Sequence, residues 1–103
     1  MPRRRVSFRR SAINDLRNLF TYIAETSGMP LTAKAYADRI EQRCRLLGDF
    51  PFIGRDHSNV RAGLRVLPFE SVAIVFEVAD TSVRIRRIFN QRQDYQRQLR
   101  QLR

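Results

Sequence analysis

The chain has 103 residues, of which 43% are hydrophobic, and its 20 lysines and arginines against 10 aspartates and glutamates give a net charge of +10. This length and apolar fraction allow one domain, residues 1–103, with a real core, and they exclude global disorder. Lys34 is the single lysine, and arginine favours planar contacts to carboxylate or phosphate. The charge therefore predicts an anionic partner: a nucleic acid, an acidic protein or an anionic membrane surface.

Residue types that mark metal, cofactor and catalytic sites are sparse. Cys44 is the only cysteine, which excludes an internal disulfide and a cysteine-rich zinc site. His57 stands beside Asp56 in a polar stretch without a nearby nucleophile, so we interpret it as a solvent-exposed loop histidine. We expect no cofactor, no metal and no catalytic residue.

The sequence carries no signal for a membrane protein. No apolar run approaches the ~20 residues that span a bilayer. The basic N-terminus is not followed by the apolar core of a signal peptide. We therefore expect a cytoplasmic protein that does not contact a membrane.

The first half of the chain has the periodicity of helices. A short extended run, Val6–Phe8, predicts an edge strand, and Arg9–Ser27 then places its apolar residues on one helical face. Gly28 is a helix stop, and Pro30 suits the start of a second helix that runs to Leu47. The short connection predicts an antiparallel helical hairpin.

The second half predicts strands. After an irregular stretch we expect strands at Leu64–Phe69, Val72–Val78 and Ser82–Phe89, joined as an antiparallel meander. The run Val72–Val78 is almost continuously apolar, so we expect it at the centre of the sheet. Gln91–Arg103 predicts a short last helix with a thin apolar stripe.

These elements indicate an α+β fold. An N-terminal helical hairpin should pack on one face of a small twisted antiparallel sheet, with a short C-terminal helix. We expect the other face of the sheet to be partly open.

Several arginines stand at positions that suggest a role. Arg87 should share one side of a regular strand with Val83, Ile85 and Phe89. It is then either inward and paired, with Glu77 or Glu70 as candidates, or exposed in a concave site, and a bulge is a third explanation. Arg55 follows Gly54 in the long loop and suits a clamp on loop carbonyls. Arg65 opens a strand.

A set of short motifs runs through nearly the whole chain in a characteristic order. The motifs are Asp15-Leu16, Tyr22-Ile23-Ala24-Glu25 with Ser27-Gly28, Ala35-Tyr36 with Arg39-Ile40, Pro51-x-x-Gly54-Arg55, Gly63-Leu64-Arg65, Ile74-Val75-Phe76-Glu77-Val78, and Val83-x-Ile85-x-Arg87-Ile88 leading to Arg92-x-Asp94. In this order and spacing, from about Val6 to Leu99, the chain resembles the ParE branch of the RelE/ParE toxin superfamily.

The resemblance implies the toxin of a type II toxin–antitoxin pair with a RelE/ParE-like fold. A ParD-like antitoxin would neutralise it in a hetero-oligomer, and its target would be DNA gyrase, inhibited without catalysis. The alternative is the RelE-type activity, a ribosome-dependent endonuclease that cleaves messenger RNA. A plain nucleic-acid-binding module ranks last, and we do not expect direct nucleic-acid binding.

The chain departs from the ribonuclease pattern at two positions. Ala73 falls where ribonuclease relatives carry a basic strand residue, and Gln98 falls near their terminal tyrosine, with Tyr95 offset. RNA cleavage needs proton transfer as well as charge stabilisation. Arg87 and Arg92 suit only the second task, which favours the ParE-like reading.

Two sets of contact residues follow. For the target we expect Arg65, Arg87, Arg92, Asp94, Tyr95 and Leu99. For the antitoxin we expect Leu19, Tyr22, Ile23, Tyr36, Arg39, Arg43, Arg84 and Arg86.

Overall fold

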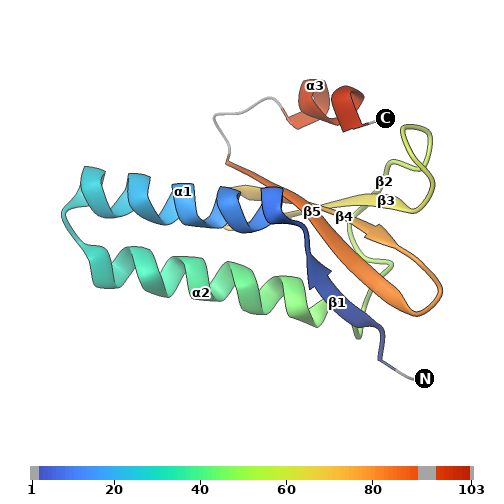
Figure 1. The fold of residues 1–103 in the computed structure, drawn as a ribbon, viewed down its shortest axis with the longest axis horizontal. Helices are drawn as coiled ribbons and strands as arrows, with labels where there is room; N and C mark the ends of the chain where they lie inside the picture. Colours follow the sequence, from blue (N-terminus) through green and yellow to red (C-terminus); the bar gives the residue numbers. More distant parts are fainter. Residues whose placement is uncertain (1–2, 91–94, 103) are drawn as a thin grey trace.

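A computed structural model of the chain describes residues 3–90 and 95–102 (Figure 1). Its elements are β1 (Arg5–Phe8), α1 (Arg10–Ser27), α2 (Pro30–Leu46), β2 (Arg55–Asp56), β3 (Leu64–Phe69), β4 (Val72–Val78), β5 (Ser82–Asn90) and α3 (Tyr95–Leu99), with a last 3₁₀ turn at Arg100–Leu102. The predicted α+β class is confirmed: two N-terminal helices pair, a sheet follows, and a short helix comes last (Figure 1).

The sheet is mixed rather than purely antiparallel. Its strand order is β1-β5-β4-β3-β2. The predicted meander of β3, β4 and β5 is confirmed, but the edge strand β1 runs parallel to β5. The two-residue strand β2 pairs with β3 inside a stretch predicted as loop, because two residues are too few to show a strand period.

The helical hairpin is built as the sequence predicts. Gly28 follows α1 with a left-handed φ of 68°, and its N–H donates to the carbonyl of Ala24. Pro30 is the first residue of α2, where its missing N–H costs nothing. The helices run antiparallel beside the sheet (Figure 1).

Alternation along β4 divides the core into two clusters. Val72, Ile74 and Phe76 belong to the larger cluster with Ala12, Ile40, Cys44 and Leu47 of the helical side. Ala73 and Val75 belong to a smaller cluster that includes Leu99 of α3. Leu99 is only 2% exposed. The expectation of a partly open second face is therefore corrected, because α3 buries Leu99 against it.

A β-bulge interrupts β5. Val75 pairs with Arg87 and Phe76 pairs with Ile85, so Arg86 is the extra residue. The bulge reverses the alternation: Ile85 lies in the larger cluster and Phe89 in the smaller one. The bulge explanation for Arg87 is confirmed, and its side chain is also paired, with Asp15. The expectation that Arg87 shares a side with Val83 and Ile85 is wrong.

Candidate partner-binding groove

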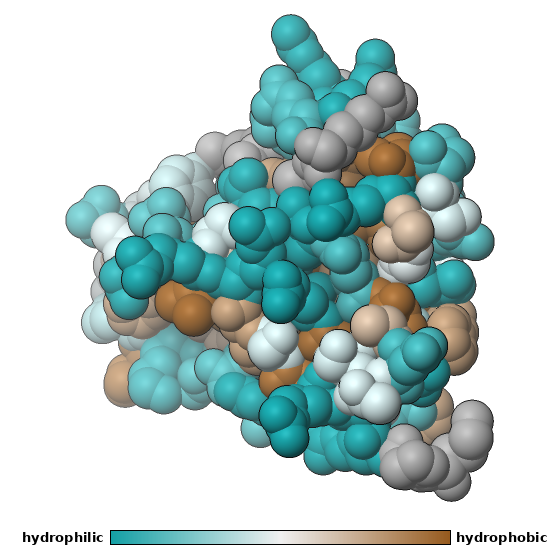
Figure 2. Space-filling model, turned by 45° about the vertical axis from the view of Figure 1, so that its right-hand side comes forward, coloured by the Kyte–Doolittle hydropathy of each residue, from teal (hydrophilic) through white to brown (hydrophobic). Residues whose placement is uncertain are grey.

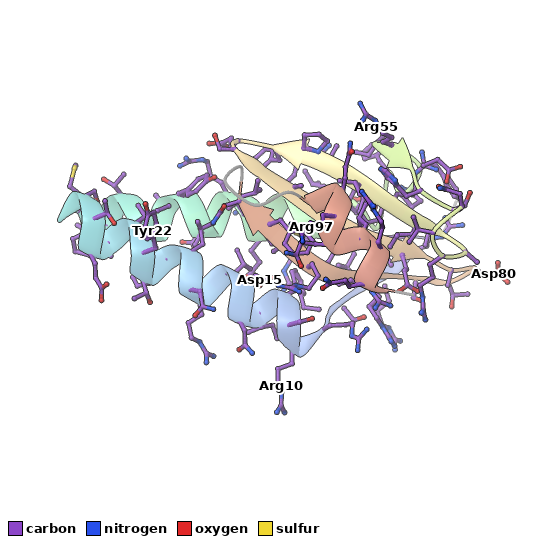
Figure 3. All side chains as sticks on the ribbon, turned by 90° about the horizontal axis from the view of Figure 1, so that it is seen from above. Arg10, Asp15, Tyr22, Arg55, Asp80 and Arg97 are labelled. Carbon is purple, nitrogen blue, oxygen red and sulfur yellow. The ribbon has the colours of Figure 1, made fainter. Side chains whose placement is uncertain are left out.

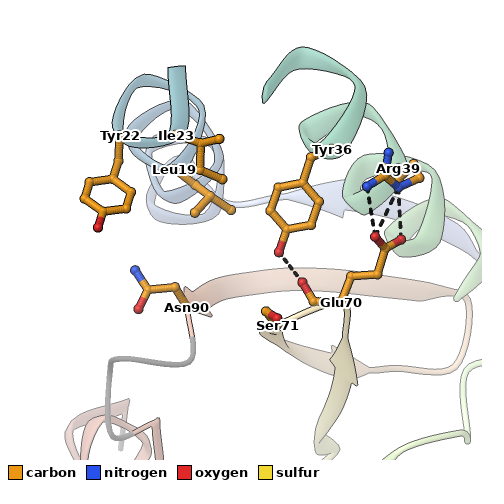
Figure 4. Close-up of a pocket in the computed structure, with 8 residues that line it drawn as sticks. All are labelled: Leu19, Tyr22, Ile23, Tyr36, Arg39, Glu70, Ser71 and Asn90. Atoms are coloured by element: carbon orange, nitrogen blue, oxygen red, sulfur yellow. Dashed lines mark hydrogen bonds and ion pairs between the residues drawn. The ribbon is translucent and has the colours of Figure 1, made fainter. Parts of the chain in front are cut away.

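A groove of about 520 Å³ lies between the two long helices and the ends of three strands (Figure 4). Its lining comes from α1, α2, the β3–β4 turn and the last residue of β5. The lining residues are Leu19, Tyr22, Ile23, Tyr36, Arg39, Glu70, Ser71 and Asn90. Apolar walls with a few polar groups suit a site that takes apolar side chains in a defined orientation.

Helical spacing explains why the helix residues meet there. Leu19, Tyr22 and Ile23 stand three and four residues apart on α1, so they share one face of that helix. Tyr36 and Arg39 stand three apart on α2 and face the same groove. Tyr22 is 44% exposed, so the groove presents apolar surface to solvent.

The floor of the groove is a strained turn. Glu70 and Ser71 connect β3 to β4 with φ angles of 42° and 74°, a left-handed conformation that residues other than glycine rarely adopt. Such residues persist only where their surroundings hold them. Here the Tyr36 hydroxyl donates to the Glu70 carbonyl oxygen, and Arg39 donates to the Glu70 carboxylate at 2.9 and 3.0 Å (Figure 4).

The surroundings of Glu70 and Tyr36 also shift the pKa values of these two side chains. The hydrogen bonds from Arg39 hold the pKa of Glu70 below its ordinary value. Burial raises the pKa of the Tyr36 hydroxyl. At neutral pH the groove therefore contains an ion pair and a protonated phenol.

A second polar arrangement joins α1 to the edge of β5. Strand β1 ends at Phe8, opposite Ile85, so the next part of β5 has strand β4 on one side and no strand on the other. Helix α1 replaces that strand: Ser11 Oγ donates to the Arg86 carbonyl at 2.8 Å, and the Ile88 N–H donates to Asp15 Oδ2 at 2.9 Å.

Asp15 is also the ion-pair partner of Arg87. Arg87 Nε and Nη2 donate to the two carboxylate oxygens at 2.8 and 3.0 Å. Figure 3 shows Asp15 on the sheet side of α1, whereas Arg10 points away. The expected partners Glu77 and Glu70 are wrong, because the bulge directs Arg87 to the strand edge, where the carboxylate of α1 lies.

The two glutamates pair with other arginines. Glu77 pairs with Arg86, and with Arg61 at 3.2 Å. Arg86 is only 7% exposed, so this predicted antitoxin contact lies inside the fold. Of the other two predicted antitoxin contacts outside the groove, Arg84 is exposed and Arg43 is half-buried.

The loop clamp is Arg65 rather than Arg55. Arg65 donates to the carbonyl oxygens of Phe52, Ile53 and Gly54 at 2.8 to 3.2 Å. Arg55 is exposed at the far edge of the sheet (Figure 3). The sequence placed the clamp at the wrong arginine because the loop folds back on β3, and β2 brings Asp56 opposite Arg65.

Among the described residues, the predicted target contacts do not come together in one exposed site. Arg65 and Arg87 are bonded as described, and Leu99 is buried. Tyr95 begins α3, and Arg92 and Asp94 lie outside the described residues. In contrast, Leu19, Tyr22, Ile23, Tyr36 and Arg39, all predicted for the antitoxin, meet in the groove.

Three lining residues were not predicted. Glu70, Ser71 and Asn90 complete the groove. The pair Glu70-Ser71 between two strand runs is the signal for a turn, but no local pattern places that turn beneath Tyr36. Asn90 extends β5 by one residue beyond the predicted end.

Two candidate reactive groups are part of the fold. Cys44 is buried, and burial raises the pKa of its thiol to about 12. His57 is half-buried rather than exposed, and its Nε2 is buried without a hydrogen-bond partner among the described residues. Within residues 3–90 and 95–102, no group of three or more His, Cys, Asp or Glu side chains is placed to hold a metal ion.

Hydrophilic side chains cover most of the face shown in Figure 2, and apolar atoms show between them in separate patches. No helix in the described part of the chain is long and apolar enough to cross a membrane. The exposed surface thus suits contacts to polar partners with local apolar anchors.

The family model for the ParE toxin of the type II toxin–antitoxin system parDE matches residues 6–95. The chain belongs to the ParE toxin family. Toxin ParE3 of Caulobacter vibrioides is 33% identical over 95 residues, which are 92% of this chain and 94% of that protein. A structure of the chromosomal ParDE toxin–antitoxin system from P. aeruginosa matches with a TM-score of 0.72 at 21% identity, over 84% of this ParE-family chain and 95% of that one. That structure supports the fold.

Proposed function

We propose that this ParE-family toxin is neutralised by a ParD-like antitoxin that lies in the groove, and that the free toxin inhibits DNA gyrase without catalysis. One observation carries the first part. Five side chains predicted for the antitoxin from the sequence converge on one groove from two helices. The matching structure from P. aeruginosa is of a ParDE toxin–antitoxin system, which supports the class of partner.

The groove fits an amphipathic helix. An antitoxin helix would lay apolar side chains between Tyr22 and Tyr36, in the manner of a helix in a groove. The net charge of +10 favours an acidic antitoxin, because long-range attraction speeds association.

The proposal that the toxin acts without catalysis is supported by Ala73 and by the contacts of the sheet arginines. Ala73 stands at the position of a basic residue in ribonuclease relatives, and it is buried in the cluster that contains Leu99. The guanidiniums of Arg65 and Arg87 are engaged in contacts within the fold. These features favour inhibition by binding over RNA cleavage.

The target contacts remain a proposal centred on the C-terminal segment, Gln91–Leu102. Arg100 is exposed there, whereas Leu99 is buried and anchors α3 to the smaller core cluster. Replacement of Arg100 by Gln should therefore reduce target inhibition without a loss of stability, and replacement of Leu99 by Ala should reduce both.

A supercoiling assay with purified gyrase tests the target. We expect the full chain to block supercoiling or to stabilise a cleavage complex, and the antitoxin to reverse the effect. Toeprinting of translated messages runs in parallel. Cuts in the ribosomal A site together with unimpaired supercoiling would replace this proposal with the RelE-type activity.

A further inference from the structure

Three large apolar side chains are exposed where α2 meets the loop that follows it. Leu46 is 46% exposed, Phe50 is 61% exposed and Phe52 is 62% exposed. Pro51 between the two phenylalanines is buried, which fixes the backbone that presents them. Two exposed phenylalanines side by side mark an interaction surface more often than a lone apolar residue does.

Two cavities share Arg3 and Arg4 in their walls, and the rings of Phe50 and Phe52 line the first of them. The first, of about 360 Å³, is lined mainly by Phe50, Pro51, Phe52 and Ile53. The second, of about 530 Å³, is polar and also takes Arg5, Arg45, Thr81 and Ser82 into its wall. We call the two cavities and the exposed rings of Phe50 and Phe52 the phenylalanine–arginine face.

This face is held rigidly. The Arg4 N–H donates to the Gly48 carbonyl at 2.9 Å, and Arg4 Nε donates to the Ala79 carbonyl at 2.9 Å. A Cβ at Gly48 would lie 2.5 Å from the Arg4 carbonyl oxygen, so only glycine allows this approach. The guanidinium carbons of Arg4 and Arg65 lie 5.1 and 5.9 Å from the centre of the Phe52 ring. Rigid anchors lose little entropy when a partner binds.

Positive charge exceeds negative charge at this end of the molecule. Four arginines line the two cavities, and Asp49 is the acid in their walls. Three acids lie near these arginines. Asp49 lies 3.6 Å from Arg3, and Glu41 pairs with Arg45 at 3.2 Å. Asp80 is exposed and precedes Thr81 in the sequence.

We propose that the phenylalanine–arginine face binds an acidic segment of another protein chain. An apolar side chain of that segment would enter the cavity beside Phe50 and Phe52, and neighbouring carboxylates would pair with arginines of the polar cavity. Carboxylates form two-pronged hydrogen bonds with guanidinium groups. This surface is additional to the antitoxin groove, because Leu46 ends α2 about 15 Å along the helix from Tyr36.

A protein segment fits this face better than a nucleic acid does. Bases stack on open aromatic rings, but the Phe52 ring already has two guanidiniums near it. The apolar cavity is concave, whereas a base stacks on an open, flat ring.

A labelled synthetic peptide of alternating Asp and Glu around a central Leu-Phe pair is the probe. Its binding to the full chain is followed by fluorescence anisotropy, and its site by amide shifts of the ¹⁵N-labelled chain. We expect the shifts at Gly48–Phe50, Phe52–Ile53 and Thr81–Ser82. We expect at least a tenfold loss of affinity when Phe50 and Phe52 are both replaced by Ser, or when the peptide pair becomes Ser-Ser.

Controls separate this outcome from general attraction to a basic protein. Arg17→Gln removes one exposed charge of α1 and should change affinity less than twofold, whereas Arg4→Gln should weaken binding at least fivefold. Binding of a twelve-nucleotide oligothymidylate is measured in parallel, as the test for a nucleic-acid partner. The proposal is wrong if the peptide does not bind at 1 mM, if the phenylalanine variant binds it as well as the original chain, if the shifts fall in the groove, or if the oligonucleotide binds this face more tightly.

Discussion

The arginines of the sheet and the groove between the helices differ in what their side chains contact. Arg65, Arg86 and Arg87 are bonded to loop carbonyls or to carboxylates of neighbouring elements. The groove instead leaves apolar surface of α1 facing solvent beside a strained turn. A dense set of arginines therefore does not by itself mark a site, since these three serve to join elements of the fold.

The largest expected effect is on stability, through Asp15. Asp15→Ala removes the ion pair with Arg87 and the acceptor of the Ile88 N–H. Loss of a partner in a largely buried pair should lower the free energy of unfolding by about 3 kcal/mol, measured by urea denaturation.

Asp38→Ala is the matched control for Asp15, because Asp38 is exposed and pairs with the exposed Lys34 one turn away along α2. That variant should change stability by less than about 0.5 kcal/mol. Equal losses in the two variants would contradict a structural role for Asp15.

The next effect is on antitoxin affinity, through Tyr22. Tyr22→Ala should raise the dissociation constant for the antitoxin about tenfold to a hundredfold, because aromatic anchors dominate interfaces. Leu31→Ala is the control, since Leu31 is 82% exposed outside the groove. Calorimetric titration with the product of the adjacent reading frame measures both, and equal affinities would remove the groove from the account.

A smaller effect on stability is expected at Arg65. Arg65→Met keeps the apolar stem but loses three hydrogen bonds to loop carbonyls, which should cost about 1 to 2 kcal/mol of unfolding free energy. Arg55→Met should cost nothing measurable. If Arg65→Met abolishes toxicity while stability is unchanged, Arg65 contacts the target instead.

The smallest effect concerns Cys44 at alkaline pH. Burial raises its folded pKa to about 12 from an ordinary value of 9.0, so the unfolded chain loses the thiol proton first as the pH rises. Stability should therefore fall by about 1 kcal/mol between pH 9 and pH 10. Cys44→Ala should remove that part of the fall, and an identical pH profile in both chains would show that the thiol does not contribute.

The sequence predicts local elements well and side-chain partners poorly. Periodicity gives both ends of β3 and β4, and Gly28 and Pro30 give the turn between the helices. The pairing of Arg87 with Asp15 spans 72 residues, and it depends on a bulge that no local pattern reveals. For the same reason the sequence predicted Arg55 as the loop clamp, whereas Arg65 makes those contacts.

In the candidate groove, too, the sequence predicts what is local and misses what depends on contacts between distant elements. Spacing along α1 and α2 is a local property, so the helix side of the groove could be predicted. The strand side depends on where the β3–β4 turn docks, which is set by Tyr36 and Arg39 reaching Glu70. Residues that meet only through such docking are missed.

The most direct test of the groove is an amide-shift map of the ¹⁵N-labelled toxin bound to the product of the adjacent reading frame. We predict the largest shifts at Leu19, Ile23, Tyr36, Ser71 and Asn90, with smaller shifts along the arginines of β5. Large shifts at Arg84–Arg87 with none in the groove would contradict the account.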